Sequence, residues 1–324
     1  MLVISEADVL QLLPVSEAVD LVQQAFVSYS RGEVTCPQRL PLPLLPQGAV
    51  LLSMPAFDGR EYAGVKLVGV QPENAGRRLP VVRATYVLFN ACTCEALALI
   101  AATNLTAIRT GAAGGVAASL LARPEADTLA IIGAGAQAET QLLAAVAVRP
   151  IRDAWIYSRD PRHTDAFLER MAHQVRVRLH PASSSADAVS QAAIVVTATN
   201  ASTPVFADSD LQPGTHVTGV GAFTSAMQEI PDATIARAAL YLDADDAAWH
   251  EAGELAGTLA RGVIQRDHAV GEIGALADGR LPGRTSSTQI TVFKSVGLAA
   301  QDLLCAAAVY RRALEAAVGV RASL

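Results

Sequence analysis

A short glycine-containing segment is the first feature of this sequence that could do chemistry. Residues 133–138 read Gly-Ala-Gly-Ala-Gln-Ala, directly after the apolar run 128–132 and before a helical pattern. This G-x-G-x-x-A arrangement of strand, turn and helix is typical of Rossmann domains, where the helix N-terminus binds the pyrophosphate of a dinucleotide. The first glycine permits a tight turn, the second lets backbone N–H groups approach the phosphates, and the small third residue lets helix and strand pack closely. The predicted cofactor residues in this turn are Gly133, Gly135, Ala136, Gln137 and Ala138.

The end of the next predicted strand indicates which dinucleotide binds. An NAD(H) enzyme usually places Asp or Glu there, against the ribose hydroxyls. Here the strand ends with Ser158 and Arg159, which can bind a ribose phosphate, so NADP(H) is favoured over NAD(H). Asp160 lies one residue further, and a shift of the alignment by one residue would reverse this preference. Thr197, near the end of a later strand, completes the predicted cofactor set.

The segment around these residues alternates strands with helices. Strands are expected at 128–132, 153–158, 175–179, 193–198, 215–220 and 239–243. Such alternation predicts a parallel, doubly wound α/β sheet with helices on both faces. We assign this NAD(P)-binding Rossmann domain to residues 121–290.

The flanking residues 1–120 and about 291–324 predict a second, discontinuous α+β domain. Ser5 and Ser16 each begin an amphipathic helix, and apolar runs broken by Pro and Gly between Arg39 and Asn90 predict several strands. The alanine-rich stretch 95–121 predicts a helix. The segment from about Thr291 is also expected to be helical and to return to the first domain.

Composition excludes several classes of protein. The 324 residues are 51% hydrophobic and 17% charged, with a formal net charge of -6. Lysine and arginine are spread without a basic stripe, so nucleic acid is not expected as a partner. The N-terminus lacks a basic flank, and the apolar runs are shorter than the roughly 18 residues of a membrane helix. We therefore predict a cytoplasmic protein that does not bind membranes.

The cysteines and histidines give no sign of a metal site. Cys92 and Cys94 have one residue between them, too few for a zinc knuckle, and a second pair does not follow. Asp243, Asp245 and Asp246 are interpreted as strand-end caps rather than metal ligands. We expect no metal, and reduced cysteines that are buried or half-buried.

Several short motifs together resemble one known family. They are Met54-Pro-Ala, Gly64-Val-Lys66, Leu79-Pro, Leu105-Thr-Ala-Ile-Arg109-Thr-Gly-Ala-Ala, Ile131-Ile-Gly-Ala-Gly-Ala-Gln-Ala and Val292-Phe-Lys-Ser-Val-Gly. The sequence resembles the ornithine cyclodeaminase/μ-crystallin family nearly from end to end. The resemblance implies a homodimer with a discontinuous substrate and dimerisation domain and a central Rossmann domain. It also implies a small substrate carboxylate derived from an amino acid.

The resemblance assigns four residues to the substrate site. The family's carboxylate-binding arginines fall on Arg39 and Arg109, its active-site lysine falls on Lys66, and Thr85 matches a threonine of the same cleft. We interpret Lys66 and Arg109 as catalytic, and Arg39 and Thr85 as substrate-binding. A guanidinium group can bind a carboxylate through paired hydrogen bonds, and a lysine within an apolar strand is costly unless it faces a polar cavity.

Phe223 separates the candidate functions. Ornithine cyclodeaminases carry at this position an aspartate that serves the distal amine of the substrate, and phenylalanine cannot replace it because it neither accepts a hydrogen bond nor bears charge. We therefore predict an NAD(P)H-dependent reductase of a cyclic imino acid, such as Δ1-pyrroline-2-carboxylate, that gives L-proline, with Phe223 in the substrate site. The alternatives are an ornithine cyclodeaminase, an amino-acid dehydrogenase and a non-catalytic, μ-crystallin-like NADP(H)-binding protein.

Overall fold

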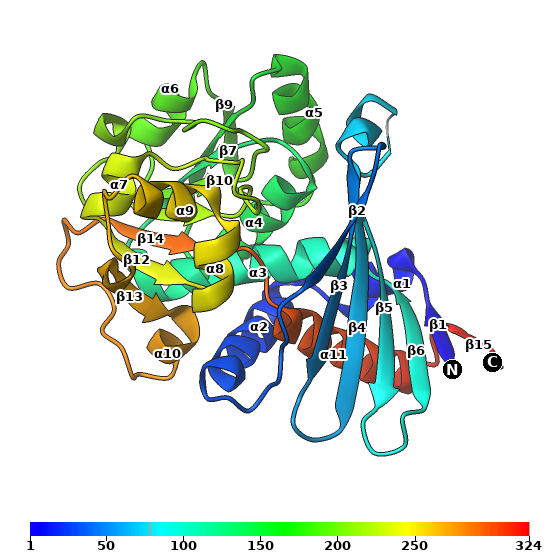
Figure 1. The fold of residues 1–324 in the computed structure, drawn as a ribbon. Coiled ribbons are helices and arrows are strands. Elements are labelled where there is room, and N and C mark those ends of the chain that lie inside the picture. Colours follow the sequence, from blue (N-terminus) through cyan, green and yellow to red (C-terminus); the bar gives the residue numbers. More distant parts are fainter. Residues whose placement is uncertain (78, 324) are drawn as a thin grey trace. The chain divides into compact units, whose positions relative to one another are not determined.

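The computed structural model describes residues 1–77 and 79–323, which divide into two compact units (Figure 1). Unit 1 comprises Met1–Arg109 and Leu298–Leu324, and unit 2 comprises Thr110–Gly297. Both divisions lie within about 12 residues of those expected from the sequence pattern, 120/121 and about 290/291. The first division falls inside helix α3 (Thr103–Leu121).

Unit 1 is built on a seven-stranded mixed sheet in the described residues, with the strand order β15-β1-β6-β5-β4-β3-β2. Helix α11 contacts β3, β4 and β5 on one face of this sheet, and α2 packs against α11 (Figure 1). The strands are β1 (Leu2–Ile4), β2 (Leu40–Leu44), β3 (Ala49–Phe57), β4 (Tyr62–Val70), β5 (Val82–Asn90), β6 (Ala96–Ala101) and β15 (Val320–Arg321); the helices are α1 (Glu6–Leu12), α2 (Val15–Ser30), the short 3₁₀ helix η1 (Pro72–Arg77), α3 and α11 (Ala299–Glu315).

The sheet of unit 1 has one buried and one outer face. One row of register partners on the buried face runs Met54, Lys66, Tyr86, Ile100 and Ile4 across five strands. All five side chains are buried. Because successive side chains of a strand point to opposite faces, Leu67 and Thr85, which pair with each other, lie on the outer face.

Unit 2 contains an eight-stranded sheet, counted over the described residues, in the order β13-β12-β14-β11-β10-β7-β8-β9. Every neighbouring pair in it is parallel. The strands are β7 (Thr128–Ile132), β8 (Asp153–Tyr157), β9 (Arg178–Pro181), β10 (Ile194–Thr197), β11 (His216–Gly219), β12 (Ala239–Leu242), β13 (Ala269–Glu272) and β14 (Thr291–Lys294). The helices are α4 (Ala136–Val148), α5 (Pro161–Met171), α6 (Ser185–Ser190), α7 (Asp232–Arg237), α8 (Asp245–Glu251), α9 (Gly253–Ala260) and α10 (Ile273–Ala277), with the 3₁₀ helices η2 (Asp208–Asp210) and η3 (Arg266–His268).

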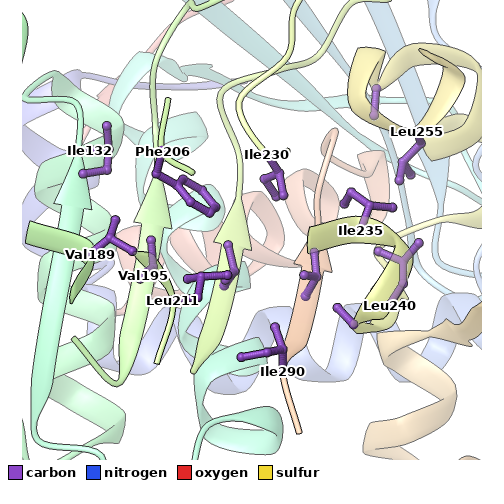
Figure 2. Packing of buried hydrophobic residues seen from close by; sticks show 14 of the residues in the cluster. Ile132, Val189, Val195, Phe206, Leu211, Ile230, Ile235, Leu240, Leu255 and Ile290 are labelled. Carbon is purple, nitrogen blue, oxygen red and sulfur yellow. The ribbon is translucent and has the colours of Figure 1, made fainter. Parts of the chain in front are cut away.

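Apolar side chains on the two faces of this sheet belong to two separate hydrophobic cores. Leu129 and Ile131 of β7 pack with residues of α4 and α5, whereas Ala130 and Ile132 belong to the opposite cluster. Figure 2 shows that second cluster, in which Ile132 and Val195 of the strands lie with Ile230 and Leu255. A sheet with a core on each face confirms the predicted doubly wound Rossmann architecture and the α/β class.

Two segments that the sequence predicts to be helical form strands instead. Ala96–Ala101 forms β6, because its alternating side chains bury Ala98 and Ile100 between β1 and β5, and this pairing outweighs the helix propensity of alanine. Thr291–Lys294 forms β14, which is fully buried between β11 and β12; the helix α11 begins only at Ala299. A third strand, β9, lies at Arg178–Pro181, three residues later than expected at its start.

Some expectations about the surface also need correction. Cys305 is buried and Cys36 half-buried, but Cys92 and Cys94 are exposed in the turn between β5 and β6, and all four are free thiols. Among the residues that the structure describes, no group of three or more His, Cys, Asp or Glu side chains could hold a metal ion. Among the described helices, none combines the length and the apolar character that crossing a membrane requires.

Candidate functional site

A buried charge cluster lies on the inner face of the unit 1 sheet. The Nζ of Lys66, in the middle of β4, donates a hydrogen bond to Oδ2 of Asp302 at 2.7 Å. The Nε of Arg109 donates to the other oxygen, Oδ1, at 3.0 Å. Lys66 and Asp302 are fully buried and Arg109 is 5% exposed, so one carboxylate bridges two cations away from water. We call Lys66, Arg109 and Asp302 the lysine cluster.

The first turn of α11 holds Arg109 in a second way. Gln301 accepts a hydrogen bond from Nη1 of Arg109 through Oε1 at 2.9 Å, and Gln301 is fully buried. The guanidinium group is thus oriented by two adjacent side chains, Gln301 and Asp302. Neither was predicted from sequence. The available signal was an acidic residue among apolar neighbours in the predicted helix, because a buried charge requires a partner.

The environment of Lys66 shifts its protonation into the neutral range. Burial and the nearby charge of Arg109 lower the pKa of Lys66 to about 7, and Asp302 opposes this shift. The charge of Arg39, which is half-buried, contributes a smaller part of the same shift. Lys66 can therefore hold or release a proton near neutral pH, which is what general acid–base chemistry requires.

The structure brings three of the four predicted substrate residues of unit 1 together electrostatically. Lys66 and Arg109 share Asp302, and Arg39 is close enough for its charge to act on Lys66. Thr85 is different, because it is exposed on the outer face of the sheet, opposite to Lys66. The same inner face carries a residue that sequence reasoning missed: Tyr86, whose buried hydroxyl has no hydrogen-bond partner in the described residues.

The glycine turn of unit 2 has the geometry that a dinucleotide needs. Gly133 has φ +115°, and a Cβ there would come within 2.4 Å of the carbonyl oxygen of Ala198. Gly135 caps helix α4 without a side-chain hydrogen bond, and a Cβ at Gly135 would meet no heavy atom within 4 Å. Ala138 is completely buried against the strand. The three small residues therefore leave the N-terminal N–H groups of α4 open to a phosphate.

This turn lies at the point where the strand order of the sheet reverses. β7 has β8 on one side and β10 on the other, and ligands of doubly wound sheets bind at the carboxyl ends of such strands. Thr197 ends β10 and is fully buried, and its hydroxyl has no hydrogen-bond partner within residues 1–77 and 79–323. The Oε1 atom of Gln137 is likewise buried without such a partner.

The residues directly after β8 are those predicted to contact the adenosine ribose. Ser158 is half-buried and Arg159 exposed, directly after the strand end at Tyr157. Asp160 caps α5 by accepting from the N–H of Arg162, and its carboxylate also pairs with the Arg162 side chain at 2.7 Å. Hydrogen bonds from Arg162 lower the pKa of Asp160 to about 2. The carboxylate of Asp160 therefore already has partners.

Phe223 and Asp243, two residues singled out in the sequence, lie in loops of unit 2. Phe223 is half-buried in the loop after β11. Asp243 caps the end of β12: its Oδ2 accepts hydrogen bonds from the hydroxyl of Ser295 and the N–H groups of Val296 and Gly297, at 2.7–2.8 Å.

Comparison with known proteins identifies the family. Residues 1–317 match the ornithine cyclodeaminase/mu-crystallin family. The chain belongs to this family, and the resemblance noted in its motifs is confirmed.

Three relatives are similar to this chain over nearly its whole length. A Δ(1)-pyrroline-2-carboxylate reductase from Bacillus cereus is 38% identical over 323 residues, 99% of each chain. The structure of the Thermococcus litoralis Δ(1)-pyrroline-2-carboxylate reductase, in complex with NADH and L-proline, is similar with a TM-score of 0.97 and 34% identity, covering 99% of this chain and 100% of that one. An archaeal alanine dehydrogenase dimer with bound NAD gives a TM-score of 0.94 at 32% identity, covering 100% and 99%.

Proposed function

We propose that this protein is an NAD(P)H-dependent reductase of a cyclic imino acid, with Δ1-pyrroline-2-carboxylate or its six-membered homologue as substrate. The lysine cluster carries the proposal, because it combines a surplus of buried positive charge with a lysine that titrates near neutrality. The names of the reductases from Bacillus cereus and Thermococcus litoralis support the substrate class.

The arginines would bind the substrate carboxylate. In the lysine cluster two cations share the single carboxylate of Asp302, and the charge of Arg39 also acts on Lys66. An anionic substrate group restores the balance of charge, and a guanidinium group can bind it through two parallel hydrogen bonds. Binding in this way would fix the ring relative to Lys66.

Lys66 would supply the proton. Reduction of the C=N bond adds a hydride to the carbon and a proton to the nitrogen, which gives the secondary amine of L-proline. The pKa of Lys66 near 7 allows its ammonium group to give up a proton at neutral pH, and Asp302 holds the Nζ in place. The neutral amine left on Lys66 then regains a proton from water.

The dinucleotide fits the glycine turn of unit 2 and supplies the hydride when bound. Gly133, Gly135 and the uncapped start of α4 would hold the pyrophosphate. Ser158 and Arg159 would contact the adenosine ribose, and because Asp160 is paired with Arg162, we propose that NADPH binds more tightly than NADH. The solved reductase from Thermococcus litoralis and the archaeal alanine dehydrogenase are in complex with NADH and NAD, respectively.

Phe223 argues against cyclisation of ornithine. A closed imine ring brings its methylene edge rather than an amine, whereas L-ornithine would lose hydration of its δ-ammonium beside a phenyl ring. A cation–π contact returns only about 0.5–2 kcal/mol.

The outer face of the unit 1 sheet supports a homodimer. Leu40 and Leu42 of β2 are 71% and 56% exposed, and Leu67 and Phe57 on the neighbouring strands are 41% and 37% exposed. Apolar exposure over adjacent strands is typical of a protein interface, and the archaeal alanine dehydrogenase is described as a dimer. We propose that a second copy covers this face, with Thr85 in the interface. A monomeric mass in light scattering would contradict this assembly.

One preparation of enzyme tests the activity. It should oxidise NADPH in the presence of Δ1-pyrroline-2-carboxylate, form L-proline, and release little or no ammonia from L-ornithine with NAD. Titration with NADPH and NADH on the same preparation measures the cofactor preference, and equal affinities contradict the role of Ser158 and Arg159. Robust ammonia release from L-ornithine with proline formation would show that the cyclodeaminase alternative is correct.

A further inference from the structure

A second buried charge cluster lies at the carboxyl edge of the unit 2 sheet, and the reaction proposed above does not use it. Lys294 ends β14 and is fully buried, with its Nζ 2.8 Å from Oε1 of Glu254 in the first turn of α9. Glu229 is also fully buried, and the charges of Lys294 and Glu254 both act on it. We call Glu229, Glu254 and Lys294 the glutamate cluster.

The carboxylate of Glu229 joins two loops that are separate in the sequence. Its Oε1 accepts a hydrogen bond from the N–H of Thr199 at 2.6 Å, in the loop after β10. Its Oε2 accepts from the N–H groups of Gly221 at 2.7 Å and Ala222 at 3.1 Å, in the loop after β11. One carboxylate therefore satisfies three backbone donors, and hydrogen bonds to a charged acceptor are stronger than those between neutral groups.

The same loops are packed so closely that glycine is required between them. A Cβ at Gly221 would lie 2.2 Å from the carbonyl oxygen of Thr199 and 2.5 Å from Oε1 of Glu229. On the other side, a Cβ at Gly133 would lie 2.4 Å from the carbonyl oxygen of Ala198. The loops after β7, β10 and β11 thus form a contiguous layer along the edge where the strand order reverses.

Glu229 is itself firmly anchored below this layer. The next residue, Ile230, is part of the buried cluster shown in Figure 2, and its Cδ1 would be 2.8 Å from a Cβ at Gly219. The backbone oxygen of Glu229 also accepts a hydrogen bond from the N–H of Val205. Since the backbone at Glu229 is fixed to the core, its carboxylate can hold the loops in one position.

We propose that Glu229 is a positioning residue for the nicotinamide half of the dinucleotide site. In a doubly wound sheet each half binds one mononucleotide, so the β7–β8 half takes the adenosine side and the β10–β11 half takes the nicotinamide side. The hydrogen bonds that the carboxylate of Glu229 accepts within the described residues come from loops of the second half. Lys294 supports this role by offsetting the negative charges of Glu229 and Glu254. The inference rests on the dinucleotide binding proposed above.

Calorimetric titration with two ligands tests the proposal. NADH contains the nicotinamide ring, and ADP-ribose has the same adenosine and pyrophosphate without that ring. In Glu229→Gln, an NH₂ group replaces one acceptor oxygen and faces backbone N–H groups, so the loops must shift. We expect the Kd for NADH to rise by at least about tenfold, because hydrogen bonds to a charged group are lost, while the Kd for ADP-ribose stays within about twofold.

Two further variants make the test decisive. Gly221→Ala separates the same loops without a change in charge and should show the same selective loss, so it decides the matter if Glu229→Gln fails to fold. Asp58→Asn is the matched control, because Oδ1 of Asp58 in unit 1 also accepts three backbone N–H groups, at 2.8–3.0 Å. It should change neither affinity.

The contrary outcomes are distinct. Equal weakening of both ligands in Glu229→Gln and Gly221→Ala, or unchanged NADH affinity in either variant, would overturn the positioning role, as would failure of both variants to fold. If the parent protein binds neither NADPH nor NADH in the same titration, the proposed function fails and this inference fails with it.

Discussion

The lysine cluster of unit 1 and the glutamate cluster of unit 2 have opposite balances of charge. In the first, Lys66 and Arg109 share the single carboxylate of Asp302. In the second, Lys294 pairs with Glu254, and its charge also acts on Glu229. The surplus negative charge of the glutamate cluster is bound by backbone N–H groups of its own loops.

This difference indicates two uses of buried charge. A cluster whose surplus is satisfied by the backbone stabilises a particular loop conformation. A cluster with surplus positive charge on side chains can instead bind an anionic ligand and exchange a proton with it. Variants that remove one cation from each cluster should therefore affect different properties of the protein.

The largest effect is expected on activity, from Lys66→Met. Methionine keeps an apolar stem in the buried position but cannot donate a proton, and Asp302 retains its contact with Arg109. Loss of a general acid typically lowers the rate by about 10²–10⁴-fold, so we expect kcat/KM for imine reduction to fall in that range. Steady-state kinetics on the folded variant measure this.

The pH profile of the parent enzyme provides the matching control. The pKa of Lys66 is lowered to about 7, so the ammonium form that donates the proton is lost as the pH rises above that value. The rate should therefore decline above about pH 7, and this limb should be absent in Lys66→Met. A variant that keeps the parent's rate and its alkaline limb would remove Lys66 from the chemistry.

The second effect is expected on stability, from Lys294→Met. Removal of this cation leaves Glu229 and Glu254 buried without a counter-charge, and breaking a buried ion pair usually costs about 3–5 kcal/mol. Urea unfolding should show a loss of this size. Lys66→Met should lose less, because Arg109 still pairs with Asp302.

The sign of the pH dependence sharpens this second prediction. Burial and Glu254 raise the pKa of Glu229, whereas Lys294 lowers it. Because its pKa is raised, the folded state binds the proton of Glu229 more tightly than the unfolded state does, so the free energy of unfolding falls as the pH rises above the ordinary carboxyl pKa. Without Lys294 this fall should be steeper than in the parent. If Lys294→Met is as stable as the parent across this range, the glutamate cluster does not depend on its lysine.

The parts of the fold and site that sequence could predict are those encoded locally. The turn 133–138 can be predicted from its own residues, because each small residue meets a steric requirement of the turn or of the helix that follows it. The alternation of strands and helices likewise predicted the doubly wound sheet. The helix predictions for Ala96–Ala101 and Thr291–Lys294 were wrong. These segments form the strands β6 and β14 because neighbouring strands pair with them.

The partners of the charged residues could not be predicted, because they depend on long-range contacts. Asp302 lies 236 residues from Lys66 in the sequence, and Glu229 lies 30 residues from Thr199. The position of Thr85 on the outer face follows from the register of β4 and β5, and a shift of one residue would have moved it to the side of Lys66. A polar residue in a predicted apolar helix or strand shows only that a partner must exist.

The smallest of the three effects tests whether the surplus charge of the lysine cluster acts through geometry. In the parent protein, the guanidinium group of Arg109 contacts Asp302 and Gln301 through two different nitrogens. Arg109→Lys keeps the positive charge but has a single ammonium group in place of this guanidinium fork. The variant cannot maintain both contacts and also pair with a substrate carboxylate. We expect a loss of about 1.5–3 kcal/mol of transition-state binding, measured from kcat/KM, with the fold retained. Arg152→Lys, at an exposed position just before β8, is the control and should leave the kinetics unchanged. Parent-like kinetics in Arg109→Lys would mean that charge alone suffices at this position and that the fork does not bind the substrate.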